Sequence, residues 1–379
     1  MDVRLLKSEI IQYCREVGID KIGFTSAEPF VELKNRLFRQ RELGYQSGFE
    51  APDIDKRTNP SLLLNGASSI ISIALAYPVK MKNRVQSKAD ERRGIFSRAS
   101  WGLDYHLVLK ERLRLLEEFI MSKYPQAVCQ SMVDTGELVD RAVAERAGIG
   151  WSGKNCSIIT PEFGSYVYLG EMVTNIPFEP DTPIEDRCGD CRKCLDACPT
   201  GALIQGGQIN ANRCISFLTQ TKEFIPEEFR DKLGNRIYGC DSCQTACPEN
   251  KRIDFHLHPE LEPEPEQVKP LLKPILSMSN REFKERFGSL AGSWRGKKPI
   301  QRNAIIALAH FKDESAVADL IQVLKNDNRP VMRGTAAWSL AKIGGQVSLS
   351  ALQEAKENEQ DDDVLIEIQQ ALQILTRMD

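Results

Sequence analysis

The sequence lacks long hydrophobic runs and the common nucleotide-phosphate motifs. Its most apolar stretch, Ser69–Val79, is far too short to span a bilayer, and the N-terminus alternates charged with apolar residues, unlike a signal peptide. No G-x-G-x-x-G follows a predicted strand, and no G-x4-G-K-S/T occurs, so neither a dinucleotide-binding fold nor a P-loop is predicted. We therefore expect a cytoplasmic protein without a membrane partner.

Histidine is scarce, and cysteine is sparse outside one region. Only four histidines occur in 379 residues, and three of the eleven cysteines, Cys14, Cys129 and Cys156, lie outside the cysteine-rich region. These three show no disulfide-like spacing and are interpreted as buried structural thiols. The composition therefore indicates a reducing compartment.

The other eight cysteines have the spacing of a ferredoxin. The first four follow the pattern C-x2-C-x2-C-x3-C-P, in which three thiolates bind one cubane and the fourth binds the other. A pair of zinc ribbons would need two C-x2-C knuckles per metal, so the pattern favours two [4Fe-4S] clusters and an electron-carrying protein. The predicted ligands are Cys188, Cys191, Cys194 and Cys247 for the first cluster, and Cys198, Cys214, Cys240 and Cys243 for the second.

Positive charge is concentrated in one stretch, although the whole chain has a formal net charge of −3. Residues 281–302 hold seven cations and two acids, and Ser293–Lys298 joins a tryptophan to a glycine-loosened cationic cluster. This composition binds phosphates and stacks on unpaired bases, although a solvated surface is the alternative. Just upstream, prolines break the acidic segment 258–266, so residues 258–299 are predicted to be an acidic and basic linker.

Beyond residue 300 the chain repeats itself with a period of 32 residues. Such a period predicts stacked helical hairpins, and an R-x-x-A-x-x-x-L pattern makes them HEAT-like. Residues 300–379 are therefore predicted to be an α-helical repeat domain that binds a partner or braces the fold. The aligned segments are 303–311, 335–343 and 367–375, with Leu308, Leu340 and Leu372 in register.

The N-terminal half is predicted to be mixed α/β. The fold class is therefore α+β, with a mixed domain over 1–177, a ferredoxin-like two-cluster module over 178–257, the linker and the repeats. The predicted strands are 70–77, 127–133 and 164–173, and the predicted helices are 104–124 and 135–147, the second ended by Gly148.

Several motifs resemble one enzyme family. The stretch 133–155, VDTGELVDRAVAERAGIGWSGKN, is similar to the hallmark of epoxyqueuosine reductases, and the stretches 164–171, 213–219 and 238–248 resemble that family too. The resemblance covers nearly the whole chain. It implies a cobalamin bound by the N-terminal domain and the ferredoxin-like module, a tRNA carrying epoxyqueuosine in its anticodon loop, and an external electron donor. The implied reaction is the two-electron, two-proton reduction of epoxyqueuosine to queuosine, the final step of queuosine biosynthesis.

Asp134 is the candidate for proton transfer. It lies between a predicted strand and a predicted helix, with Glu137 three residues later, so the residues alone fit a helix-capping box equally well. The family's matching aspartate is the expected proton donor, which implies that Asp134 is catalytic and faces the corrin. There the carboxyl group would lose hydration, and its pKa would rise.

The resemblance also implies contacts for which ordinary packing or solvation is the alternative. His106 lacks the following glycine of D-x-H-x-x-G, so it is predicted to be a helix-face residue and not a cobalt ligand. Tyr105 and Tyr168 either line a nucleoside pocket or fill the core. The implied corrin contacts are Arg57, Ser97, Ile158, Leu169 and Ser216, and the predicted tRNA contacts are Lys222, Arg281, Arg295, Lys297 and Lys298.

Two other functions also fit the residues. Another corrinoid and iron-sulfur reductase, such as a relative of the reductive dehalogenases, would share the ferredoxin-like module but would not need the basic stretch or the repeats. A non-catalytic electron-transfer adaptor would use the repeats to dock a partner and would bind no corrin. Cobalt content and RNA binding distinguish the three.

Overall fold

The computed structural model describes residues 2–376, which form two compact units. The first unit comprises residues 2–80, 102–214 and 241–262, and the second comprises residues 81–101, 215–240 and 263–376. Neither unit is therefore one continuous stretch of sequence. Within residues 2–376, no helix has the length and apolar character needed to cross a membrane.

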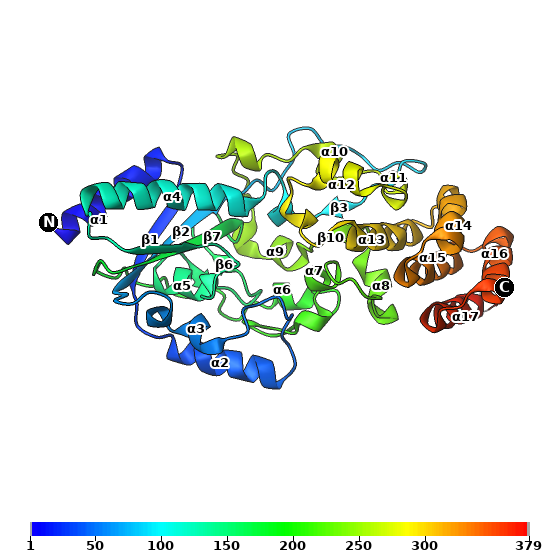
Figure 1. Cartoon of the computed structure of the whole chain (residues 1–379), viewed down its shortest axis with the longest axis horizontal. Helices are drawn as coiled ribbons and strands as arrows, with labels where there is room; N and C mark the ends of the chain where they lie inside the picture. The colour runs from blue at the N-terminus through cyan, green and yellow to red at the C-terminus, as the bar shows by residue number, and fades with distance from the viewer. Residues whose placement is uncertain (1, 377–379) are drawn as a thin grey trace. The chain divides into compact units, whose positions relative to one another are not determined.

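The first unit is built on an antiparallel sheet of four strands in the order β1-β2-β7-β4. Its central strand β2 is buried along its whole length, because helices cover both faces of the sheet. Figure 1 shows α1 and α4 on one face and α5 on the other. The elements are β1 (Lys21–Ser26), β2 (Ser69–Ala76), β7 (Val167–Thr174), β4 (Cys129–Met132), α1 (Val3–Glu16), α4 (Tyr105–Lys123) and α5 (Asp140–Arg146).

The predicted strands and the predicted helix over 104–124 are confirmed. Helix α4 begins where the side chain of Asp104 accepts a hydrogen bond from the backbone N–H of His106. Its buried side chains recur at helical spacing and face the sheet, as the amphipathic pattern indicates. They are Val108, Leu109, Leu113, Leu116 and Ile120.

The predicted helix over 135–147 is wrong in its first part. Helix α5 begins at Asp140, and residues 134–138 form bends. Asp134 has a φ of 51°, a left-handed conformation that cannot lead directly into a right-handed helix. The helix instead starts after Val139, which makes no side-chain capping bond. Asp134 is therefore not a helix cap, and the capping-box interpretation is excluded.

Short elements complete the first unit and support the cysteine-rich region. Lys154 reaches across to this region, because its ammonium group donates to the backbone carbonyls of Gly189 and Cys191. The elements are α2 (Val31–Glu42), α3 (Ile54–Thr58), η1 (Pro60–Leu62), β5 (Trp151–Ser152), β6 (Ile158–Ile159), α6 (Lys193–Asp196), β8 (Leu203–Gln205), β9 (Gln208–Ile209), η3 (Ala211–Arg213), α9 (Ser242–Thr245), η4 (Pro248–Asn250) and η5 (Pro259–Leu261).

The second unit is mainly helical and contains the repeats. Helices α13, α15 and α17 carry the three aligned segments, so the period of 32 residues is confirmed. The helices are α7 (Ile215–Leu218), α8 (Glu227–Leu233), α10 (Pro265–Val268), α11 (Lys273–Leu276), α12 (Asn280–Phe287), α13 (Lys297–His310), α14 (Val317–Asn326), α15 (Pro330–Ile343), α16 (Gln346–Asn358) and α17 (Asp362–Thr376). The short elements are β3 (Ile95–Phe96), β10 (Arg236–Tyr238), η2 (Arg98–Ser100), η6 (Ala291–Ser293) and η7 (Glu314–Ala316).

Residues 258–299 differ from the predicted linker, because much of the segment is folded. Helices α10, α11 and α12 lie within it, and α12 has a capping box formed by Ser279 and Glu282. Apolar side chains of this segment enter the core of the second unit, which explains why the segment is ordered despite its prolines and charges. These side chains include Val268, Leu272, Ile275, Phe283 and Phe287.

Helix α13 lies at the centre of the second unit. Its apolar side chains contribute to two separate cores, one shared with the repeats and one shared with α7 and α8. Arg302 is fully buried and donates to the backbone carbonyls of Leu218 and Thr221. Arg302 is thus a structural residue and not part of a basic surface.

Candidate functional site

Asp134 lies in the loop that joins β4 to α5. Its side chain is 59% exposed, whereas the residues on either side of the loop are held by the sheet and by α5. The backbone N–H of Asp134 donates to Oδ2 of Asp140 at 3.1 Å. This bond joins the loop to the first residue of α5 and holds the left-handed conformation at Asp134.

His106 connects Asp134 to helix α4. Its Nδ1 lies 2.7 Å from Oδ1 of Asp104, and its Nε2 lies 3.3 Å from Oδ2 of Asp134. Ionised carboxylates only accept hydrogen bonds, so an imidazole between two of them must donate from both nitrogens. This geometry requires an imidazolium.

The titration of these groups agrees with that geometry. Burial alone would lower the pKa of His106, but hydrogen bonds to Asp104 and Asp134 raise it to about 9. The hydrogen bond from His106 is the main cause that lowers the pKa of Asp134, and Tyr105 acts in the same direction. The expectation of a raised pKa for Asp134 is therefore wrong for the protein alone. At neutral pH the proton lies on His106, and Asp134 is a carboxylate.

Stacked aromatic rings lie beside this pair. The rings of Tyr105 and Tyr168 are 4.4 Å apart and nearly parallel, and Tyr105 also stacks on His106 at 4.1 Å. Tyr168 continues the stack to Tyr77 at 4.5 Å. Tyr168 and Tyr77 are buried, whereas Tyr105 is half-buried, so the stack joins the core to the surface at Asp134.

Two further carboxyl groups lie behind the loop. Glu171, on β7, is 1% exposed, and neither of its oxygens has a hydrogen-bond donor within reach. Burial and the neighbouring charge of Asp140 raise the pKa of Glu171 well above its usual range. Burial is also the main cause that raises the pKa of Asp140 to about 6. Two carboxyl groups can hydrogen-bond to each other only if one is protonated, so these titrations belong together.

Some of the predicted cluster ligands lie close together, because Cys247 and Cys188 belong to the same apolar cluster. Burial is the main cause that raises the pKa of Cys194, and the charges of Cys247 and Cys188 add to it. Cys194, in the cysteine run that ends before Pro199, thus lies near Cys247 of the second run, as expected if the first set of cysteines binds one cluster. Backbone N–H groups around Cys198 offset its burial and lower its pKa, an environment that suits a thiolate ligand.

The corrin contacts implied by resemblance fall in both units. In the first unit, Ile158 and Leu169 contribute to the same apolar cluster, and Arg57 lies on α3. Nε of Arg57 is buried without a hydrogen-bond partner, although the charges of Glu50 and Asp140 favour its charged form. In the second unit, Ser97 begins η2 and Ser216 lies in α7.

Four of the five predicted tRNA contacts line one cavity of about 690 Å³ in the second unit. Arg281 is not among its lining residues and pairs with Glu285 at 2.8 Å. The loop between α14 and α15 supplies the opposite wall. The lining residues are Lys222, Asn280, Arg295, Lys297, Lys298, Asn326, Asp327, Asn328 and Arg329.

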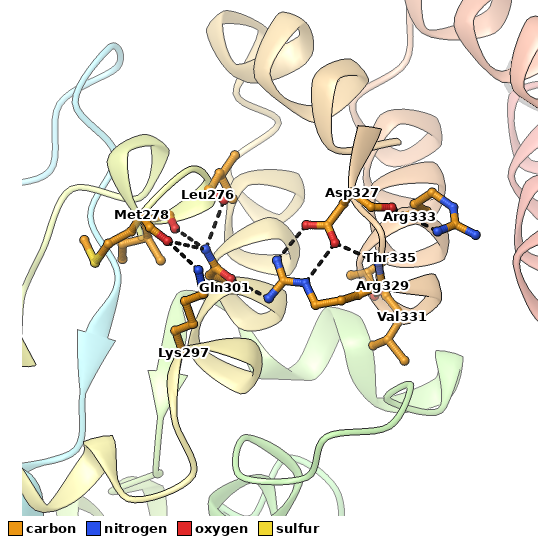
Figure 2. A network of polar contacts seen from close by, with 10 residues as sticks. Leu276, Met278, Lys297, Gln301, Asp327, Arg329, Val331, Arg333 and Thr335 are labelled. Carbon is orange, nitrogen blue, oxygen red and sulfur yellow. Dashed lines mark hydrogen bonds and ion pairs between the residues drawn. The ribbon is translucent and has the colours of Figure 1, made fainter. Parts of the chain in front are cut away.

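Figure 2 shows how polar contacts hold the walls of this cavity. Arg329 donates to both carboxylate oxygens of Asp327 and to Oε1 of Gln301. Gln301 and Lys297 both donate to the backbone carbonyl of Met278. The one acidic side chain of the cavity wall is therefore neutralised by Arg329, which leaves the wall positively charged.

Reasoning from the sequence missed several of these residues. His106 is predicted from the sequence only as a helix-face residue and not a cobalt ligand, although Asp104 two residues earlier could have suggested a hydrogen-bonded pair. The sequence does not indicate that Asp140 and Glu171 belong to the site, because their proximity depends on the packing of α5 on β7. Asn326, Asn328 and Arg329 also lie too far along the chain from the basic stretch to be grouped with it.

Comparison with known protein families identifies three regions of the chain. Family models match residues 57–135 (epoxyqueuosine reductase QueG, DUF1730), 187–250 (4Fe-4S double cluster binding domain) and 295–373 (HEAT repeats). The chain therefore contains a double-cluster domain, which favours iron-sulfur clusters over zinc ribbons, and a HEAT-repeat region.

Relatives match over their full length. An epoxyqueuosine reductase of Bacillus anthracis is 67% identical over 100% of this chain and 99% of its own, and one of Bacillus subtilis is 64% identical over 99% and 97%. A crystal structure of an epoxyqueuosine reductase with an epoxyqueuosine-modified tRNA stem loop superposes with a TM-score of 0.97 at 64% identity, covering 99% of this chain and 100% of that one. A Bacillus subtilis structure with its Asp134 catalytic loop swung out of the active site also gives 0.97, at 63% identity and the same coverage. The chain belongs to the epoxyqueuosine reductase family.

Proposed function

We propose that this protein reduces epoxyqueuosine to queuosine in the anticodon loop of tRNA, and that the proton for the epoxide oxygen is held between Asp134 and His106. The observation that carries the proposal is the position of His106 between two carboxylates, next to a side chain that is open to solvent. The substrate is inferred from the full-length relatives, which are named epoxyqueuosine reductases. The crystal structure of a related enzyme with an epoxyqueuosine-modified tRNA stem loop supports binding of this substrate.

The residues of the first unit fit a bound corrin. Arg57 offers a buried Nε without a partner, which suits a carboxamide oxygen, and the partly buried Leu169 packs on the apolar cluster that contains Ile158. We assign Arg57, Ser97, Asp134, Ile158, Leu169 and Ser216 as the cofactor contacts. Cobalamin, when bound, supplies a strongly reducing cobalt centre for the epoxide carbon, and the clusters supply its electrons one at a time.

The chain's own part in the reaction is to deliver a proton. The side chain of Asp134 is the exposed member of the pair, and its Oδ2 lies 3.3 Å from Nε2 of His106, which holds the proton. As charge develops on the opening epoxide oxygen, that proton moves through Asp134 to the oxygen. The pKa of about 9 keeps His106 charged at neutral pH, so the imidazole carries the proton before each reaction. Asp104 holds the ring by its other nitrogen.

Two sets of cysteines are proposed to bind the clusters, with Cys188, Cys191, Cys194 and Cys247 in one and Cys198, Cys214, Cys240 and Cys243 in the other. The proximity of Cys194 to Cys188 and Cys247 supports the first set. The second set rests on the spacing of the two runs. We also propose that an external electron donor reduces the clusters.

The cavity of the second unit is proposed to bind the phosphates of the tRNA. Lys222, Arg295, Lys297 and Lys298 supply positive charge around one opening, and Asp327 does not cancel it because Arg329 binds that carboxylate. Arg281 is proposed as an outer contact only, because it does not line the cavity and pairs with Glu285.

The substitution Asp134→Asn tests the role of Asp134. Asparagine tolerates a positive φ and keeps the side-chain volume but carries no acidic proton, so folding, iron content and cobalamin content should not change. Single-turnover reduction of an epoxyqueuosine stem loop with a supplied reductant should slow by roughly 10²- to 10⁴-fold. Asp53→Asn, at an exposed helix cap, is the matched control. If Asp134→Asn reduces the epoxide at the wild-type rate, the proton comes from another group.

A further inference from the structure

We propose that Asp140 and Glu171 are positioning residues that share one proton and hold the loop of residues 133–139 so that Asp134 meets His106. The inference rests on the proposed role of Asp134, because it explains how that side chain is kept in place. It assigns a task to two acids, the buried Glu171 and the half-buried Asp140, that take no part in the proton transfer itself.

The first step concerns the backbone of the loop. An aspartate at a φ of 51° is strained relative to ordinary β or helical backbone, so this conformation persists only if surrounding bonds impose it. The hydrogen bond from the N–H of Asp134 to Oδ2 of Asp140 is such a bond. Because Asp140 is the first residue of α5, the loop is tied to the packed part of the fold.

The second step concerns Glu171, which faces the first turn of α5 from the sheet. In the register of β2, β7 and β4 it lies opposite Ser72 and Met132, and its side chain is fully buried. Neither Glu171 oxygen is reached by a donor, so an ionised Glu171 would be a buried and unpaired charge. A protonated Glu171 can instead donate to Asp140. This arrangement leaves Asp140 as the charged acceptor for the N–H of Asp134.

The surrounding charges support one shared proton. Asp134 is the third acid near the pair, and its charge raises the pKa of both Asp140 and Glu171. Arg57 on α3 is the nearby cation, and His106 neutralises Asp134 from the other side. Since His106 bonds to Asp134 and the charge of Arg57 acts on Asp140, whereas no donor bonds to Glu171, the proton remains on Glu171 and is shared with Asp140.

Hydrogen-deuterium exchange of peptides within residues 133–139, measured by mass spectrometry on the cobalamin- and cluster-loaded enzyme, tests the inference. Asp140→Ala removes the acceptor and should speed exchange at Asp134 by at least about tenfold, as expected for loss of a hydrogen bond to a charged group. Asp140→Asn keeps an acceptor and should restore most of the protection. Glu42→Gln, on exposed α2, is the matched control.

Substitutions at Glu171 test the shared proton. Glu171→Gln keeps a donor for Asp140 and should match the wild type in exchange and turnover at pH 7.5, whereas Glu171→Leu should speed exchange and lower kcat without raising KM for the stem loop. As pH rises and the pair loses its proton, the wild-type loop should lose protection while the Glu171→Gln loop keeps it. The inference is overturned if the loop of Asp140→Ala exchanges at the wild-type rate, or if the loop of Glu171→Gln exchanges as fast as that of Glu171→Leu.

The exchange readout separates this inference from the proposed function. If Asp134→Asn were fully active, the proposed proton transfer would fail, but accelerated exchange in Asp140→Ala would still show that Asp140 holds the loop. Conversely, unchanged exchange in Asp140→Ala combined with an inactive Asp134→Asn would overturn only the role of the acid pair.

Discussion

Replacing His106 with glutamine should convert a pH-independent reaction into a pH-limited one. Glutamine fills similar space and can donate one hydrogen bond to Asp134, but it cannot carry the positive charge that two carboxylates require of this position. Without the imidazolium, the proton must come from Asp134 alone, and an ordinary aspartate holds few protons at neutral pH because its pKa is about 4.

The size of the effect follows from the pKa of His106. A rise from 6.5 to about 9 corresponds to about 3 kcal/mol in favour of the charged ring, for a side chain that is 21% exposed. Because the pKa is raised by folding, this stabilisation is complete below pH 6.5 and is lost as pH rises through about 9. The unfolding temperatures of wild type and His106→Gln should therefore differ most near pH 6 and converge above pH 9.

Single-turnover reduction across pH 6–10 provides the kinetic test. Wild-type rates should be level from pH 7 to about 8.5 and should fall above about 9, when His106 loses its proton. His106→Gln should be slower by roughly 10²- to 10⁴-fold at pH 7.5, and its rate should already decline between pH 6 and 8. His310→Gln, on the exposed end of α13, is the control. A His106→Gln variant with the wild-type rate and pH profile would refute the role of His106 in holding the proton.

Three further outcomes are expected. Cys198→Ala should damage mainly the second cluster, seen as partial loss of iron with the first cluster's spectrum retained, and loss of the first cluster alone would reverse the ligand assignment. Replacing Lys297 and Lys298 with alanine should weaken stem-loop binding and flatten its salt dependence without changing iron or cobalt content, and unchanged affinity at low salt would make the cavity a solvated surface. Glu367→Ala leaves Arg230 buried without its carboxylate partner and should lower the free energy of unfolding by about 3–5 kcal/mol, whereas the double variant with Arg230→Met should recover part of it.

Features encoded by local pattern could be predicted from the sequence. The buried strand β2, the amphipathic helix α4 and the helices repeating every 32 residues each depend on periodic burial, which the residue order displays directly. The cluster domain could be predicted because thiolate spacing is itself the chemical requirement.

Features that depend on distant contacts could not be predicted. Asp134 has the neighbours of a helix cap, yet its hydrogen bond to Asp140 and its left-handed backbone delay the start of the helix by five residues, from the predicted Thr135 to Asp140. Arg302 looked like a surface cation, but carbonyl groups from a segment about 80 residues earlier in the chain surround it. The imidazolium of His106 likewise requires Asp134, which is 28 residues away.

The central position of α13 determines where this chain can be shortened. Its side chains Ile306 and Ala309 pack with α8, while Ile305 and Leu308 pack with the later repeats, and Asn303 donates to the carbonyls of Thr219 and Ile237. A gene that ended before α13 would leave the core around α7 and α8 open, so the encoded protein would aggregate. Loss of α16 and α17 would remove Glu367 from Arg230 but would leave both cores of α13 partly filled. The first helix of the repeats is therefore part of the core around α7 and α8, and shortening of the chain is expected to be tolerated only after it.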